Sequence, residues 1–106
     1  MEWIQIFPST VQARIALKEN IPQLLVVQGH RICLVLREGK FHAIQDSCTH
    51  SGESLSKGKI NFLGEVICPG HGYCFNVKTG REAGERCRDL ETYFVKEDET
   101  GLYINV

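Results

Sequence analysis

Two short motifs that each combine a cysteine with a histidine constrain this chain more than any other feature. Cys48-Thr49-His50 and Cys68-Pro69-Gly70-His71 are separated by seventeen residues and lie in glycine-containing stretches. Thiolate and imidazole together suit zinc or the iron of an iron-sulfur cluster. Structural zinc sites usually pair two cysteines and then two histidines, whereas here each motif supplies one of each. The mixed motifs therefore favour a cluster of two irons, with both cysteines on one iron and both histidines on the other.

The residues around these motifs are similar to those of a known family. The two motifs, followed by Gly72, Phe75 and Thr79-Gly80, resemble the Rieske family, and specifically its soluble ferredoxins. Residues 37–44 and 90–93 resemble the strands that carry the cluster loops in that family. The expected cofactor is one Rieske-type 2Fe-2S cluster, and its expected metal ligands are Cys48, His50, Cys68 and His71.

Short apolar runs separated by turn residues predict an all-β fold, an antiparallel sandwich or small barrel. Strands are expected at residues 3–7, 23–27, 31–37, 41–45, 65–67, 73–77, 90–96 and 102–106. One short helix is expected near residues 9–19, with Ser9 as its N-cap. Residues 46–58 have no periodic pattern and predict an irregular ligand loop. The resemblance further implies a single domain with a base (residues 1–45 and 77–106) and an inserted cluster-binding subdomain (about residues 46–76).

Length and charge limit the other functions open to this chain. Its 106 residues correspond to one domain. Because 12 Lys and Arg balance 13 Asp and Glu, no excess charge favours nucleic acid or an anionic membrane. The N-terminus lacks the features of a signal peptide, and no apolar run is long enough to span a membrane. We expect a cytoplasmic monomer that binds neither nucleic acid nor membranes.

Three cysteines remain beside the expected ligands, and this odd number argues against a disulfide framework. Cys33 lies in an apolar run, so we expect it to be buried in the core as a small hydrophobic residue. Cys87 is interpreted as a surface thiol without a redox role. The sequence assigns no chemical role to Cys33, Cys74 or Cys87.

The resemblance also bears on the reduction potential. High-potential Rieske proteins carry a cysteine in each ligand loop where this chain has Glu53 and Gly70, so no loop disulfide can form here. They also direct a serine and a tyrosine hydroxyl at the cluster, where this chain has Tyr73 and Phe75. Phenylalanine cannot donate a hydrogen bond. We therefore expect a potential near the low end of the Rieske range of about −150 to +300 mV.

Charged residues flank the ligand segment without forming a surface of one sign, which indicates a mixed, solvated face. The basic ones are Lys57, Lys59, Lys78, Arg81, Arg86 and Arg88, and the acidic ones are Glu53, Glu82, Glu85 and Asp89. His30 and His42 do not combine with a carboxylate in the pattern of a non-haem iron site. We therefore expect the chain to transfer electrons and not to activate oxygen.

The leading hypothesis is a one-electron carrier and not an enzyme: a soluble Rieske ferredoxin that passes electrons from a reductase to a terminal oxidoreductase. The resemblance implies a flavoprotein as the reductase and an oxygenase as the acceptor. One alternative is a fixed subunit of a larger oxidoreductase, similar to the small subunit of nitrite reductases. The other is a zinc-stabilised module without redox function. The donor, the acceptor and the pathway cannot be read from the sequence.

Overall fold

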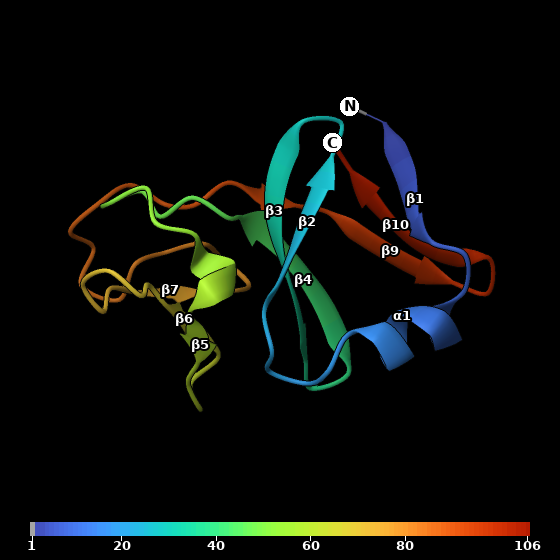
Figure 1. Cartoon of the computed structure of the whole chain (residues 1–106), viewed down its shortest axis with the longest axis horizontal. Coiled ribbons are helices and arrows are strands. Elements are labelled where there is room, and N and C mark those ends of the chain that lie inside the picture. The colour runs from blue at the N-terminus through green and yellow to red at the C-terminus, as the bar shows by residue number, and fades with distance from the viewer. Residues whose placement is uncertain (1) are drawn as a thin grey trace.

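The computed structural model describes residues 2–106, which form ten strands, one α-helix and one short 3-10 helix (Figure 1). The strands are β1 (Trp3–Phe7), β2 (Gln23–Val27), β3 (His30–Arg37), β4 (Lys40–Gln45), β5 (Lys59–Ile60), β6 (Glu65–Ile67), β7 (Cys74–Asn76), β8 (Thr92–Tyr93), β9 (Val95–Asp98) and β10 (Gly101–Asn105). The helices are α1 (Thr10–Ala16) and the 3-10 helix η1 (Leu55–Lys57). Within residues 2–106, no helix is long and apolar enough to cross a membrane.

The strands form three antiparallel sheets, which confirms the prediction of an all-β fold. Their strand orders are β1-β10-β9, β2-β3-β4-β8 and β5-β6-β7. In Figure 1 the first sheet lies on the right, the second in the centre, and the small third sheet on the left with the long loops. Strand β1 lies at the edge of its sheet. The third sheet and its loops therefore project from one end of the molecule.

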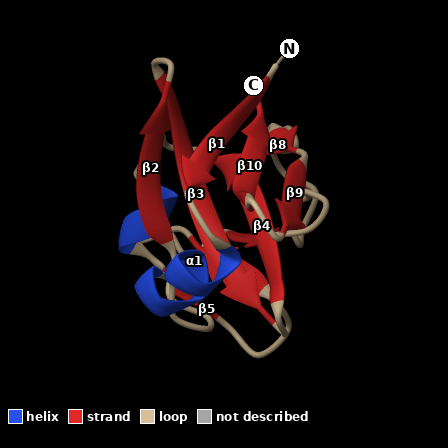
Figure 2. Cartoon of the chain, turned by 90° about the vertical axis from the view of Figure 1, so that its right-hand side faces the viewer, coloured by secondary structure: helices blue, strands red, loops and turns tan. Residues whose placement is uncertain are grey.

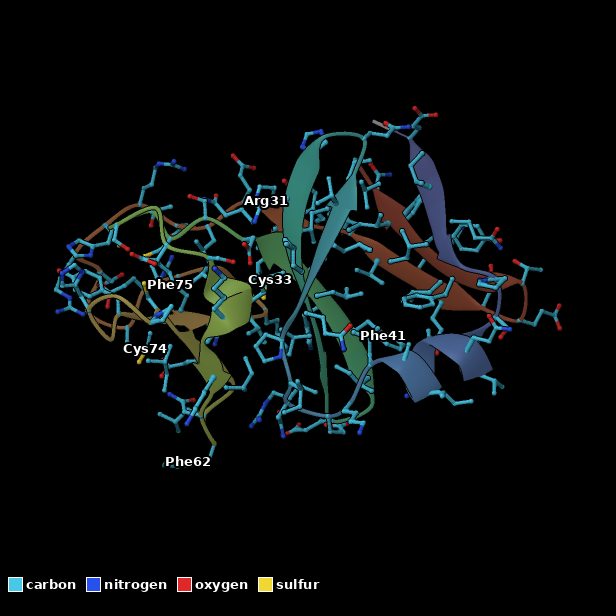
Figure 3. All side chains as sticks on the ribbon, in the orientation of Figure 1. Arg31, Cys33, Phe41, Phe62, Cys74 and Phe75 are labelled. Carbon is cyan, nitrogen blue, oxygen red and sulfur yellow. The ribbon has the colours of Figure 1, made fainter. Side chains whose placement is uncertain are left out.

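Strand β3 separates two hydrophobic cores because both of its faces are buried. Its side chains alternate: Ile32, Leu34 and Leu36 belong to one core, and Cys33 and Val35 belong to the other. This explains the continuous apolar run in the sequence and confirms the expected burial of Cys33. In Figure 3, Cys33 lies near the third sheet, whereas Phe41 lies toward α1.

The second core lies beneath the candidate ligand loops and holds them in place. It contains Leu55 from η1, Val66 from β6 and Phe75 from β7, all of them fully buried. Cys48 and Cys68 belong to the same core. Burying each large apolar side chain contributes about 1.5 to 3 kcal/mol to the stability of the fold. This core therefore stabilises the segments from which the ligand loops extend.

Helix α1 begins as predicted but ends earlier. The Ser9 side chain accepts a hydrogen bond from the N–H of Gln12 (3.0 Å) and so caps the helix. The helix stops at Ala16 and does not continue to Glu19, because the next segment is bound by the β3–β4 turn. There the Glu19 carboxylate accepts hydrogen bonds from the N–H groups of Glu38 and Gly39 (both 2.9 Å). Figure 2 shows α1 across the lower end of the sheets.

Three other elements differ from the expectation. Residues 90–96, expected as one strand, form β8 and β9, which pair with β4 and β10 in different sheets. The chain crosses between the sheets at Phe94, whose side chain is exposed. Residues 46–58, expected to be irregular, contain η1, because the Asp46 carboxylate accepts hydrogen bonds from the Ser54 hydroxyl and the Ser56 N–H. Strand β5 was not expected either, since two residues are too few for a recognisable pattern.

Candidate metal centre

The first candidate ligand loop follows β4 and is closed by two backbone hydrogen bonds. The N–H of Cys48 donates to the carbonyl of Glu53 (2.9 Å), and the N–H of Gly52 donates to the carbonyl of Cys48 (2.7 Å). Gly52 has a φ of +78°, a conformation that side chains disfavour. The buried Asp46 ties the start of this loop to its end through Ser54 and Ser56. The cysteine backbone is thus held in a closed turn.

The second loop joins β6 to β7 and repeats the same hydrogen-bond pattern. The N–H of Cys68 donates to the carbonyl of Tyr73 (2.8 Å), and the N–H of Gly72 donates to the carbonyl of Cys68 (3.0 Å). Gly72 also has a positive φ, +73°. In both loops the glycine is four positions after the cysteine, and the histidine lies between them. The backbones of the two loops therefore close in the same way after each cysteine.

The structure brings the four expected ligands together as two like pairs. The thiols of Cys48 and Cys68 are buried, with 3% and 1% of each residue exposed, and the Cys48 thiol is one of the groups that lower the pKa of Cys68. His50 and His71 are exposed on the outer side, with ring centroids 4.9 Å apart and ring planes at 83°. Sulfur therefore lies inside and nitrogen lies outside, at the end of the molecule beyond the third sheet.

The donor types of these two pairs can be compared with the requirements of known metal centres. Within residues 2–106, no group of three or more His, Cys, Asp or Glu side chains is placed to hold a single ion. A structural zinc ion needs four ligands around one point. A 2Fe-2S cluster with histidine ligands instead needs two sulfurs at one iron and two nitrogens at the other. The donor types and their pairing match the second requirement.

Comparison with protein families gives the same assignment over most of the chain. The model described as the Rieske 2Fe-2S domain matches residues 8–94. The chain belongs to the Rieske 2Fe-2S domain family. A Rieske-type 2Fe-2S cluster is the cofactor that this membership implies.

Curated relatives of this Rieske chain include proteins of different lengths. Apoptosis-inducing factor 3 of Homo sapiens is 46% identical over 50 residues, which cover 47% of this chain and 8% of that protein. Ferredoxin CarAc of Metapseudomonas resinovorans is 42% identical over 67 residues, which cover 61% of each. The matched stretch therefore spans less than two thirds of either relative.

The fold also matches solved Rieske ferredoxin structures. A ferredoxin in the complex of reduced oxygenase and oxidized ferredoxin of carbazole 1,9a-dioxygenase is similar to this chain with a TM-score of 0.79 and 27% identity. The match covers 96% of this chain and 91% of that one. The similarity therefore includes the base sheets as well as the ligand loops.

Several polar groups act on the thiol of Cys68. The Ser51 hydroxyl lies 3.5 Å from Cys68 Sγ, within hydrogen-bond distance of sulfur. Burial raises the pKa of the Cys68 thiol, but the bond with Ser51 lowers it. The N–H groups of Gly70 and His71 and the Cys48 thiol lower this pKa further, so that it lies below its usual value. These donors would stabilise a thiolate. The sequence analysis did not single out Ser51, although its place between His50 and Gly52 in the ligand loop was a usable signal.

The two positions that carry hydroxyl donors in high-potential Rieske proteins behave differently here. Phe75 is fully buried in the second core and has no donor. Tyr73 turns its ring onto His50, with centroids 3.9 Å apart and planes at 14°. Glu53 and Gly70 are neighbours, since a Cβ added to Gly70 would lie 3.0 Å from Glu53 Cγ. The two ligand loops are therefore in contact at Glu53 and Gly70, the positions where high-potential Rieske proteins carry the cysteines of a disulfide.

The remaining cysteines and histidines lie outside the paired ligands. Cys74 and Cys87 are free thiols that are partly exposed to solvent. The Thr49 hydroxyl lies 3.4 Å from Cys87 Sγ and donates to the carbonyl of Arg88 (2.6 Å). These contacts fix the 86–89 segment against the first loop.

The burial of Glu82 contradicts the expectation that all the charged residues flanking the ligand segment lie on a solvated face. Its side chain is fully buried and accepts hydrogen bonds from Arg86 Nε (3.1 Å) and Arg86 Nη2 (2.9 Å). The bond with Arg86 is the main cause that lowers the pKa of Glu82 to about 2. Sequence reasoning missed this pair because two charges four residues apart, outside a predicted helix, are usually both exposed.

Proposed function

We propose that this chain is a one-electron carrier of the Rieske ferredoxin type and not a catalyst. It would accept an electron from a reductase, with a flavoprotein as the expected class, and pass it to a terminal oxygenase or another oxidoreductase. The similarity to ferredoxin CarAc, at 42% identity, supports this assignment. The solved complex of a related ferredoxin with its oxygenase supports an oxygenase as the acceptor.

The observation that carries this proposal is the like pairing of the ligands, with both thiols inside and both imidazoles outside. We propose Cys48 and Cys68 as the ligands of the inner iron, and His50 and His71 as the ligands of the outer iron. When bound, the cluster takes up and releases one electron. The thiols anchor it to the core, and the exposed imidazole edges offer a short path to a docked partner. Redox encounters of this kind are weak and small in area.

We also propose the division of the chain and its compartment. Residues 46–76 would be the cluster-binding subdomain, inserted between the base segments 1–45 and 77–106. The third sheet, which lies wholly within residues 59–76, supports this division. All five cysteines are free thiols, which supports the reducing environment of the cytoplasm.

The decisive experiment is electron paramagnetic resonance of the dithionite-reduced protein, prepared anaerobically with and without 15N-labelled histidine. We expect two irons and two sulfides per chain and hyperfine coupling to two histidine nitrogens. Cys48→Ser and Cys68→Ser should each abolish cluster binding. His30→Gln is the matched control, because His30 is also exposed but lies at the start of β3, and its nitrogen coupling should equal that of the wild type.

Three results would contradict the proposal in different ways. A protein without iron, or with iron that shows no nitrogen coupling, would remove the electron-carrier function. One zinc per chain in a colourless protein would favour the zinc module. A stable partner that co-purifies at equal amount with the loaded chain would favour a fixed subunit over a free carrier.

A further inference from the structure

The side chains of His50, Tyr73 and Arg86 stack on one another and form a column. The ring of Tyr73 stacks on this imidazole with a centroid distance of 3.9 Å. The guanidinium carbon of Arg86 lies 3.7 Å from the centroid of the same Tyr73 ring. Because both groups are in van der Waals contact with the ring centre, they must lie on its opposite faces. Tyr73 is therefore enclosed between an imidazole and a cation.

The buried carboxylate of Glu82 fixes the outer end of this column. It holds two nitrogens of the Arg86 guanidinium, Nε and Nη2, in a bidentate pair. It also accepts hydrogen bonds from the N–H groups of Gly84 (2.8 Å) and Arg86 (2.7 Å). A bridge between Phe75 of β7 and Glu82 places this turn against the third sheet. Four donors on one buried carboxylate leave the guanidinium little freedom to leave Tyr73.

The column has two physical effects on the imidazole. The stacked ring restricts rotation of the His50 side chain, which would otherwise be free because His50 is exposed. The Arg86 cation is attracted to the face of the Tyr73 ring. Only this ring separates the positive charge from the imidazole of His50. A positive charge near a centre favours the state of that centre with one more electron. The Glu82 charge offsets part of this field, and water screens another part because the Arg86 side chain is 53% exposed.

We propose that Arg86, anchored by Glu82 and stacked on Tyr73, is a positioning residue that orients His50 and raises the reduction potential of the centre it binds. This inference rests on the proposed function, since it requires His50 to be a ligand of the cluster. It assigns a redox role to a charge pair outside both ligand motifs.

The primary test is the reduction potential of Arg86→Gln, measured by protein-film voltammetry on the fully loaded protein. The variant keeps a planar polar group but removes the charge, so its potential should fall below that of the wild type. The difference should shrink at high salt. Arg81→Gln is the matched control, because Arg81 lies in the same segment and pairs with the exposed Glu85 at 3.8 Å, outside the column. Its potential should match the wild type.

Two further variants separate charge from stacking. Arg86→Lys keeps the charge without the planar guanidinium and should recover most of the potential that Arg86→Gln loses. Tyr73→Leu removes the ring and should alter the coupling of one histidine nitrogen in the paramagnetic resonance spectrum, whereas Tyr73→Phe should preserve it. A residue that only supports the fold would change stability without these redox and spectroscopic effects.

The outcomes distinguish this inference from the proposed function. If the wild type shows two coupled histidine nitrogens but loaded Arg86→Gln keeps its potential, Arg86 has no redox role and the carrier function survives. If the wild type shows no coupled nitrogen, the carrier function itself fails. Should Arg86→Gln not load, the double variant Glu82→Gln/Arg86→Gln, which leaves no unpaired carboxylate, replaces it. A potential equal to that of the wild type in the double variant would also overturn the inference.

Discussion

Gly52 and Gly72 occupy equivalent places in the two ligand loops, each donating its N–H to the carbonyl of the cysteine four positions earlier. Both have positive φ, and a Cβ added to either would meet no atom within 4 Å. An alanine at either position is therefore disfavoured only by its backbone conformation. The two glycines give a direct test of how far loop geometry controls cluster binding.

Gly52→Ala and Gly72→Ala should each destabilise the protein by about 1 to 2 kcal/mol, because the left-handed conformation costs a side chain that amount. Since the strain falls on the ligand loops, both variants should lose the cluster faster to an iron chelator, followed by absorbance. Gly29→Ala is the matched control, with a φ of +83° and no atom within 4 Å, in the β2–β3 turn. Equal rates of cluster loss in all three variants would show that loop geometry is not the cause.

Ser51→Ala should lower the reduction potential, because the Ser51 hydroxyl lies within hydrogen-bond distance of Cys68 Sγ. A bond of about 1 kcal/mol that favours the reduced state corresponds to about 40 mV for one electron. Voltammetry measures this shift directly. Ser9→Ala removes a hydroxyl at the N-cap of α1 and should cost about 1 kcal/mol of stability without changing the potential. An unchanged potential in Ser51→Ala would show that the hydroxyl does not reach the sulfur in the loaded protein.

His71→Cys should shift the potential toward the value of about −400 mV typical of clusters with four cysteine ligands, or lose the cluster. The reason is charge, since a thiolate adds one negative charge where an imidazole adds none. Voltammetry and iron analysis of the same sample distinguish the two results. A fully loaded variant with the wild-type potential would remove His71 from the set of ligands.

The sequence predicted the parts of the fold in which a local pattern of side chains is compatible with only one structure. The apolar run of β3 predicted a strand and the burial of Cys33, and the two motifs predicted which cysteines and histidines would lie near one another. The expected single strand at residues 90–96 was wrong because no turn residue marks a break there, while the pairing changes from one sheet to another at Phe94. Pairing partners depend on tertiary structure, which a local pattern does not contain.

The Glu82–Arg86 pair was missed for a related reason. The pair is four residues apart, as in a helix, but the chain there forms a turn in which Glu85 has a φ of +53°. The burial of Glu82 depends on its bridge to Phe75 in β7. The stacking of Tyr73 depends in turn on where Arg86 is held. In the sequence these residues look like a mixed set of charges. Each of these contacts depends on another contact that is distant in the sequence, so a local pattern does not reveal them.

Cys33 should resist alkylation in the folded protein. Burial, followed by the nearby charge of Asp46, raises the pKa of its thiol to about 12, so little reactive thiolate is present near neutral pH. Peptide mass spectrometry after brief treatment with iodoacetamide should find label on the half-buried Cys74 or Cys87 before Cys33. Treatment of the unfolded chain is the control and should label all three. Rapid labelling of Cys33 in the native state would indicate that the second core opens.

Glu82→Gln should reduce the free energy of unfolding by about 2 to 3 kcal/mol at pH 7. This is less than for a fully buried ion pair, because the Arg86 side chain is half exposed. The folded-state pKa of Glu82 is about 2, below its ordinary value of 4.5. The contribution of Glu82 is therefore complete above about pH 4.5 and is lost as the pH falls toward about 2.

Denaturant unfolding of the wild type and Glu82→Gln at several pH values between 7 and 3 measures this contribution. The difference between the two proteins should be constant from pH 7 to about 5 and should shrink below it, since Gln cannot titrate. Glu85→Gln provides the comparison, because Glu85 is exposed and its pair with Arg81 at 3.8 Å is worth less than about 1 kcal/mol. A difference between wild type and Glu82→Gln that stays constant down to pH 3 would show that Glu82 is not a charged anchor. In that case the side chain would act through its shape and hydrogen bonds alone.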